Sequence, residues 1–231
     1  IKFMKNNTFF ITGTDTDVGK TIITKGLITL FKQKNKTAVG IKPISAGLDK
    51  FKGKMLNADV AELMQVNSVK IDSEILNPYA FKYPASPHIS SMNENISIDF
   101  NFIKKKVNEI NKEVDYLFIE GAGGYFCPLD SSRTLSDLIY YIGEPVIVVV
   151  GLKLGCLNHA LMTINALEQK QQNIFGWIAN TIEPKMNFEK ENINYLKENI
   201  KHPFLGHVPY MENNAEKNFS NYISWPLSPA T

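Results

Sequence analysis

The stretch FFITGTDTDVGKT, residues 9–21, constrains the fold of this chain more than any other part of the sequence. An apolar run is followed by a polar loop that ends in Gly-Lys-Thr, and an amphipathic helical pattern begins there. A loop that runs from a strand into a helix N-terminus presents backbone N–H groups to an anion. In such loops a lysine reaches the β- and γ-phosphates and a hydroxyl contacts magnesium, and Lys20 and Thr21 are the candidates here. The stretch therefore predicts a strand, a phosphate-binding loop and a helix.

The spacing of this loop departs from the usual pattern. Five residues, not four, separate Gly13 from Gly19, and Thr14 stands where the first glycine usually lies. The end of the loop is unchanged, because Gly19 is followed directly by lysine and threonine. We interpret the loop as a deviant phosphate loop; the alternative is an ordinary connection in which Gly-Lys-Thr is accidental.

Short β-rich runs alternate with amphipathic helical patterns along the rest of the chain, which is typical of a parallel sheet with crossover helices. The continuous apolar run at 144–151 indicates a strand covered on both faces. We expect an α/β fold in one domain over residues 1–231: a three-layer sandwich with a mostly parallel central sheet, similar to P-loop NTPases. The expected strands are 8–12, 36–41, 115–120, 144–151 and 174–180, and the expected helices are 20–34, 100–114, 157–172 and 187–199. Residues 77–91 are expected to be an extended loop, and residues 1–7 a tail that is disordered or not native.

Composition and charge argue against several classes of protein. The net charge of +2 does not favour a polyanion-binding surface, so a nucleic-acid partner is not expected. No apolar stretch reaches the ~18 residues of a membrane span, and no apolar segment of a signal peptide follows the N-terminus. Cys127 and Cys156 do not make a disulfide framework, and we expect both to be small buried apolar residues. A cytoplasmic protein without a membrane partner is the simplest interpretation.

Three charged residues follow expected strands or open an expected helix. Glu120 ends the apolar run YLFIE beside the phosphate loop, where a carboxylate can hold magnesium; the alternative is a solvated glutamate before a glycine turn. Lys42 follows the expected strand at 36–41 and could stabilise a transferring phosphoryl group, although a surface lysine is the favoured interpretation from the residues alone. For Asp59, the favoured interpretation is a carboxylate that serves only the helix dipole.

Together these motifs resemble dethiobiotin synthetase, the ATP-dependent carboxylase–cyclase family of biotin biosynthesis, whose own phosphate loop has this long spacing. The resemblance runs nearly end to end. It is carried by TGTDTDVGKT (12–21), KPISAG (42–47), NAD (57–59), NPYAFKYPASPHIS (77–90), EGAGGYFCPL (120–129), VVVGLKLGCLNHALMT (148–163), GWIAN (176–180) and LGHVPY (205–210).

The resemblance implies a reaction and its reactants. Family members use ATP and Mg²⁺ to join CO2 to 7,8-diaminononanoate, and the products are dethiobiotin, ADP and phosphate. One amine becomes a carbamate, whose oxygen attacks the γ-phosphate and forms a carbamic–phosphoric anhydride. The second amine then closes the ring and phosphate leaves. The protein mainly holds the reactants in line and neutralises charge.

The resemblance also implies roles for individual residues. Magnesium ligands are expected at Thr21, Asp59 and Glu120, and catalytic groups at Lys20, Lys42 and Thr16. Asn180 is expected to read adenine, since a carboxamide can donate and accept hydrogen bonds at once. The other expected nucleotide contacts are Asp15, Asp17, Val18 and Gly19 in the loop, Gly121, Ala122 and Gly123 after Glu120, and Thr181, Pro209, Tyr210, Met211 and Glu216 around the base and ribose.

The expected substrate contacts come from two segments. Leu154 and Asn158 open a helix whose N–H groups could bind the substrate carboxylate, and in the family this segment serves the partner subunit of a homodimer. In the Lys-Pro motif the family usually has Ser or Thr where this chain has Ala46. Either Ser45 has taken over that contact, or the hydrogen bond is absent, which would weaken substrate binding by about 1 kcal/mol.

Three other functions remain as alternatives. Partition and division-site ATPases share the deviant loop, but they carry an additional lysine early in it, and no lysine lies between Gly13 and Gly19. A nucleotide-binding module without catalysis has no need of Lys42, Asp59 and Glu120 around the γ-phosphate. A ring-forming ligase with another diamine substrate is the hardest alternative to exclude.

Overall fold

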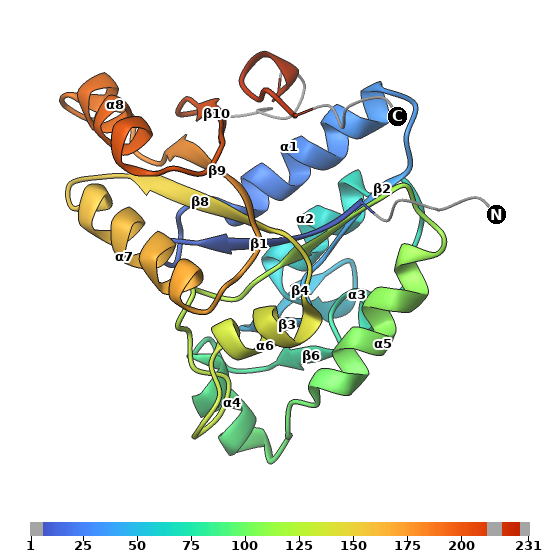
Figure 1. Ribbon diagram of the computed structural model, residues 1–231. Helices are drawn as coiled ribbons and strands as arrows, with labels where there is room; N and C mark the ends of the chain where they lie inside the picture. The colour runs from blue at the N-terminus through green and yellow to red at the C-terminus, as the bar shows by residue number, and fades with distance from the viewer. Residues whose placement is uncertain (1–6, 212–218, 227–231) are drawn as a thin grey trace.

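The computed structural model describes residues 7–211 and 219–226, and its centre is a six-stranded sheet (Figure 1). The strand order is β10-β9-β8-β1-β7-β2, and each neighbouring pair is parallel. The strands are β1 (Asn7–Gly13), β2 (Ala38–Ile41), β7 (Tyr116–Glu120), β8 (Val146–Leu152), β9 (Ile174–Thr181) and β10 (Phe204–Val208). The expected α/β class and the strands quoted above are confirmed, with boundaries shifted by up to two residues; β10 was not expected.

Alternating side chains of β1 explain the three layers. Phe9 and Ile11 pack into a core with α1 (Lys20–Gln33), whereas Phe10 points into the core on the other face. That second core is covered by α5 (Phe100–Asn111), α6 (Leu135–Ile142), α7 (Cys156–Gln169) and α8 (Glu189–Asn199), and it includes Trp177. The sheet is therefore buried on both faces, as its continuous apolar strands predict.

Asn7 corrects the expected N-terminal boundary. It was placed in the tail, but it is the first residue of β1 and pairs with Tyr116 of β7. The domain therefore includes residue 7 in its central sheet. Residues 1–6 lie outside the described part of the chain.

Smaller elements fill the segment between β2 and α5. The strands β3 (Ile44–Ala46) and β6 (Tyr79–Phe81) form a parallel pair, and β4 (Asp49–Phe51) and β5 (Lys54–Leu56) form a hairpin. The helices are α2 (Ala58–Val66), α3 (Ser73–Leu76) and α4 (Pro87–Glu94). The prediction of an extended loop over 77–91 is wrong, because this segment contains β6 and the first five residues of α4. Pro87 is compatible with α4, because it occupies the first turn of that helix.

The carboxyl ends of the parallel strands place the polar candidates at one edge of the sheet. Gly13, Glu120, Leu152 and Thr181 end β1, β7, β8 and β9, and Lys42 follows β2 directly. This edge is where open α/β sheets hold their ligands. Within the described residues, none of the helices combines the length and apolar character needed to cross a membrane.

Candidate active site

The phosphate loop is fixed by a glycine and by an asparagine from a distant strand. Gly19 has φ of 85°, and a Cβ added there would lie 2.1 Å from Nδ2 of Asn180. The Asn180 side chain is buried and donates a 2.9 Å hydrogen bond from Nδ2 to the carbonyl of Val18. Gly19 is thus required both for its backbone conformation and for the close approach of β9. Asn180 supports the loop; its contact with adenine stays a prediction.

Lys20 and Thr21, the first two residues of α1, face the interior of the site. Lys20 is buried, and its Nζ donates to the carbonyl oxygen of Asp15 at 3.0 Å. Burial lowers the pKa of Lys20, although the carboxylate of Glu120 acts in the opposite direction. The hydroxyl of Thr21 donates to Oε1 of Glu120 at 2.8 Å. The loop residue and the strand-end carboxylate are therefore in direct contact, as the sequence predicts.

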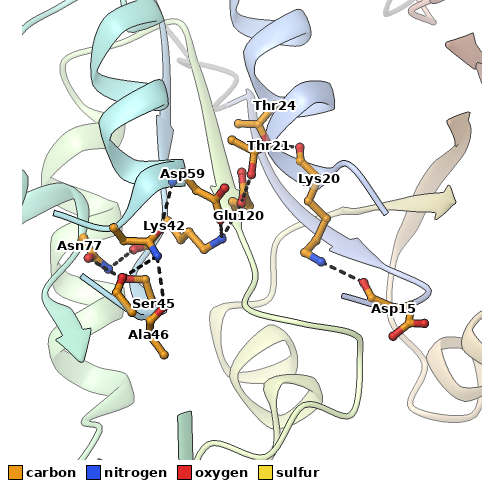
Figure 2. A network of polar contacts seen from close by, with 12 residues as sticks. Asp15, Lys20, Thr21, Thr24, Lys42, Ser45, Ala46, Asp59, Asn77 and Glu120 are labelled. Carbon is orange, nitrogen blue, oxygen red and sulfur yellow. Dashed lines mark hydrogen bonds and ion pairs between the residues drawn. The ribbon is translucent and has the colours of Figure 1, made fainter. Parts of the chain in front are cut away.

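Lys42 is not a surface lysine, and that favoured interpretation is wrong. Only 7% of its surface is exposed, because it follows β2 into the edge of the sheet. Its Nζ pairs with Oδ2 of Asp59 and lies 2.9 Å from Oε1 of Glu120 (Figure 2). Burial alone would lower the pKa of Lys42, but the two carboxylates more than offset it and raise the pKa above its ordinary value.

Asp59 does more than serve the dipole of α2. It lies in the first turn, where the side chain of the N-cap residue Asn57 accepts its N–H at 3.1 Å, and its carboxylate turns to Lys42. Burial would raise the pKa of Asp59, but Lys42 holds it below its ordinary value. Lys42 therefore joins α2 to β7 through two carboxylates.

The oxygen atoms around Lys42 fit a magnesium ion. Oε2 of Glu120 is buried and has no hydrogen-bond partner among the described residues, so it is available to a ligand. Thr21, Asp59 and Glu120 offer one hydroxyl and two carboxylates, which are hard oxygen donors of the kind magnesium prefers. In the described part of the chain no three His, Cys, Asp or Glu side chains gather in a metal-binding cluster. A magnesium ion here would share its coordination with phosphate oxygens and water.

Two cavities meet at these residues. The first, of about 320 Å³, is lined by the loop residues Thr16, Asp17, Gly19, Lys20 and Thr21 and by Lys42, Asp59 and Glu120. The second, of about 600 Å³, shares Thr16, Asp17, Lys42, Asp59 and Gly123 with the first and extends to Ser45, Ala46, Ala122, Ser86 and Cys127. The geometry thus provides two adjoining compartments with Lys42 on the boundary.

Ser45 and Ala46 line the second cavity, but they differ in what their side chains can do. Ser45 is buried, and its hydroxyl donates to Oδ1 of Asn77 at 2.8 Å. Nδ2 of Asn77 donates in turn to the carbonyl of Lys42 at 2.6 Å. Sequence reasoning missed Asn77 as a support of Lys42, and nothing in the NPYAF motif indicates that contact.

The residues that we expect around the base and ribose do not line the two cavities at Lys42. The Thr181 hydroxyl contacts Glu189 at 2.6 Å and His207 at 2.8 Å, and burial lowers the pKa of His207 despite Glu189. Pro209, Tyr210 and Met211 follow β10, and Met211 packs against the core on the α1 side. Gly121 packs closely against Leu135, and Glu216 lies outside the described residues. Nucleotide contacts at these positions stay predictions.

Leu154 precedes the N-cap of α7 and Asn158 lies in its first turn, and neither residue lines the two cavities. Leu154 is 99% exposed, and Asn158 is also exposed. In a single chain these residues reach no described site, so their role as substrate contacts stays a prediction that involves a second subunit.

Cys156 is buried and Cys127 is half-buried, and both are free thiols.

Comparisons with known proteins agree with one another. A family model described as an AAA domain matches residues 7–218. The chain is 41% identical over 216 residues to the ATP-dependent dethiobiotin synthetase BioD of Wigglesworthia glossinidia brevipalpis, covering 93% of this chain and 94% of the relative. It is 38% identical over 217 residues to the protein of the same name from Vibrio cholerae, covering 94% of each.

Solved structures support the fold alone. The MinC:MinD cell division protein complex of Aquifex aeolicus matches with a TM-score of 0.56 at 17% identity, covering 93% of this chain and 85% of that chain. A ParA family ATPase from Chlorobium tepidum matches with a TM-score of 0.56 at 11% identity, covering 94% of this chain and 90% of that chain. These likenesses support an α/β fold of the P-loop NTPase type for this chain.

Proposed function

This chain belongs to the family of ATP-dependent dethiobiotin synthetases of biotin biosynthesis, and from that premise we propose how its own residues carry out the reaction. The substrates are 7,8-diaminononanoate, CO2 and ATP. One amine of the diamine forms a carbamate with CO2, and a carbamate oxygen attacks the γ-phosphorus as the bond to ADP breaks. The second amine attacks the carbonyl carbon of the resulting anhydride, phosphate leaves with the carbamate oxygen, and the cyclic urea closes.

The observation that carries this proposal is the position of Lys42 between the two cavities. Its Nζ pairs with Asp59 and Glu120, and its side chain lines both cavities, at the boundary where the carbamate and the γ-phosphate would meet. Because Lys42 is buried, its attraction to these two anionic groups would not be screened by bulk water. We assign to Lys42 the stabilisation of the carbamate and of the transferring phosphoryl group.

The first cavity is the proposed nucleotide site. Lys20 would turn from the Asp15 carbonyl to phosphate oxygens, and Thr16 would line the reacting centre from the loop. Thr21, Asp59 and Glu120 would hold Mg²⁺, which when bound neutralises phosphate charge. The buried, unpartnered Oε2 of Glu120 supports this assignment.

The second cavity is the proposed site of the diamine, and a second subunit is part of the proposal. Leu154 is fully exposed, and Phe126 and Met162 are 59% and 63% exposed around a cavity that also reaches Asp15. Large apolar side chains of this kind are typical of subunit interfaces. In a homodimer, Leu154 and Asn158 of one subunit would bind the carboxylate tail of the substrate in the other.

We propose the cytoplasm as the location of the protein, because its two free cysteines are compatible with a reducing compartment.

An isotope experiment tests the reaction. The purified protein is incubated with ATP, Mg²⁺, 7,8-diaminononanoate and CO2 labelled with ¹³C and ¹⁸O, with carbonic anhydrase omitted. Mass spectrometry should find ¹³C in the urea carbon of dethiobiotin and ¹⁸O in the released phosphate, because the carbamate oxygen leaves with the phosphoryl group. Dethiobiotin without label transfer to phosphate would reject the anhydride route.

The remaining alternatives predict other outcomes. A partition-type ATPase would hydrolyse ATP without consuming the diamine. A ligase for another diamine would release phosphate with a shorter or uncharged diamine but not with 7,8-diaminononanoate. ADP formation that is strictly coupled to dethiobiotin would exclude both.

A further inference from the structure

The phosphate loop carries two carboxylates, Asp15 and Asp17, at a place that is proposed to receive a triphosphate. Anionic side chains so close to an anionic ligand oppose its binding unless their charge is neutralised. The structure neutralises one of them. Nζ of Lys153 lies 2.9 Å from Oδ2 of Asp15 and forms both a hydrogen bond and an ion pair with it.

Asp15 makes hydrogen bonds to two other residues of the loop as well as to Lys153. Its Oδ1 accepts the N–H of Thr16 at 2.8 Å, and its carbonyl oxygen accepts Nζ of Lys20 at 3.0 Å. The hydrogen bond from Lys153 is the main cause that holds the pKa of Asp15 below its ordinary value, and burial opposes it. The Asp15 carboxylate is therefore charged and paired with Lys153.

Lys153 comes from a different part of the sheet. It follows β8, which is parallel to β1 and hydrogen-bonded to it, and it precedes Leu154 and the N-terminus of α7. Its side chain reaches back across the strand ends to a residue 138 positions earlier in the sequence. The pair thus ties the phosphate loop to the junction that is proposed to bind the substrate tail.

We propose that Lys153 is a positioning residue of the nucleotide site, which neutralises Asp15 and holds the phosphate loop in the conformation that accepts a triphosphate. The inference rests on the proposed role of this loop as the nucleotide site. When Lys20 turns to the phosphates, Lys153 keeps Asp15 in place. A loop that is already held loses less conformational freedom when ATP binds, so binding is tighter.

A double-mutant cycle tests the proposal on the full chain. Binding of a non-hydrolysable ATP analogue with Mg²⁺ is measured by calorimetry for the wild type, Lys153→Met, Asp15→Asn and the double variant. In Asp15→Asn the Oδ1 that accepts from Thr16 remains, but the charge is removed. We expect Lys153→Met alone to raise Kd about three- to five-fold, a size typical of a partly exposed ion pair. In the Asp15→Asn background the same substitution should have no effect, because its partner charge is gone.

Two further variants separate positioning from folding. Lys153→Arg keeps a cation within reach of Asp15 and should retain a Kd within about two-fold of the wild type. Lys170→Met is the matched control. Lys170 lies at the opposite end of α7 from Lys153, and its Nζ lies 2.7 Å from Oδ1 of Asp137. The side chains of this pair are exposed to a similar degree as those of Lys153 and Asp15. It should leave Kd unchanged. Thermal unfolding of each variant verifies that the fold is intact.

The proposal is overturned if Lys153→Met leaves Kd unchanged, or if it raises Kd equally in both backgrounds. Equal effects would mean that Lys153 acts independently of Asp15. The effect of Lys153→Met should also shrink at high ionic strength, because the pair is partly exposed. The assay contains neither diamine nor CO2. Failure to form dethiobiotin would therefore reject the proposed function, while the result of this cycle would still decide the role of Lys153.

Discussion

The ammonium group of Lys42 lies 2.9 Å from Oε1 of Glu120, and both side chains are almost completely buried. The same carboxylate oxygen accepts the hydroxyl of Thr21, so a single atom joins the ends of β2 and β7 to the start of α1. A buried charge needs a partner, because its desolvation is costly. Lys42, the proposed catalytic lysine, and its acidic neighbours are therefore also part of what stabilises this edge of the fold.

Removing the charge of Lys42 should abolish turnover while ATP still binds. Lys42→Met removes a cation from the point where the phosphoryl group is proposed to transfer, and kcat should fall at least about 100-fold. It also leaves Glu120 buried without a cation, so the free energy of unfolding should fall by about 3–5 kcal/mol. Steady-state kinetics, nucleotide calorimetry and urea unfolding measure the three quantities.

A double variant tests the stability effect by itself, because Glu120 is also a proposed magnesium ligand and its loss would prevent turnover as well. In Lys42→Met with Glu120→Met the buried charges are gone together, and most of the lost stability should return. Turnover should remain lost. If turnover returned with stability, Lys42 would have only a structural role and the proposed mechanism would fail.

The support of Lys42 by Asn77 gives a second prediction. Asn77→Leu leaves the buried hydroxyl of Ser45 and the carbonyl of Lys42 without their partner, at a cost of about 1–3 kcal/mol for each unsatisfied group. We expect a lower urea midpoint and a lower kcat with an unchanged Kd for ATP. The control is Asn199→Ala, which removes only an exposed hydrogen bond to Tyr195. An unchanged kcat in Asn77→Leu would show that Lys42 does not depend on Asn77.

The local sequence predicts the central sheet and the phosphate loop well, because both follow from short-range patterns. Apolar runs mark β1, β7 and β8, and the loop motif adjoins a strand and a helix. The convergence of Thr21 and Glu120 follows from parallel strands that end at one edge. For the segment 77–91 the three prolines predict a loop, and this prediction is wrong. The strand β6 forms there by pairing with β3, which is a contact that the local sequence does not indicate.

Long-range side-chain contacts could not be predicted from the sequence. The burial of Lys42 depends on two carboxylates that lie 17 and 78 positions away, and a lone lysine after a strand gives no sign of them. The same holds for Asn77 and Lys153, whose partners lie on other elements. Only the resemblance to a family indicated Asp59, and no local pattern did.

The cavity wall at Ala46 gives a third prediction. Ser45 uses its hydroxyl on Asn77, so it is poorly placed to replace a substrate contact at position 46. Ala46→Ser should add a hydroxyl to the second cavity and lower KM for the diamine up to about five-fold, which corresponds to about 1 kcal/mol. Ser45→Ala should instead lower stability and leave KM for the diamine unchanged. The reverse pattern would assign the substrate contact to Ser45.

A fourth prediction concerns stability in acid. Burial would raise the pKa of Asp130, but the N–H groups of Ser132 and Arg133 and the Arg133 guanidinium lower it from 3.8 to about 2. Because the folded pKa is depressed, the stabilisation is fully present above pH 3.8 and is lost as pH falls toward 2. Asp130→Asn keeps the oxygen that accepts the two N–H groups but removes the charge. The difference in unfolding free energy between wild type and variant should therefore shrink over this range; a constant difference would contradict the shift.

The exposed side chain of Leu154 gives the last prediction, which tests whether the site is completed by a second subunit. If a dimer buries Leu154, then Leu154→Asp should shift the chain toward monomer in sedimentation experiments. KM for the diamine should rise as the dimer dissociates, whereas Kd for ATP should change little, because the phosphate loop and Lys42 belong to one chain. Tyr195→Asp, on the exposed side of α8, is the control and should change neither quantity. A wild type that is monomeric at assay concentrations, or a variant that is monomeric with an unchanged KM, would contradict a shared site, since each subunit would then bind the substrate tail with its own residues.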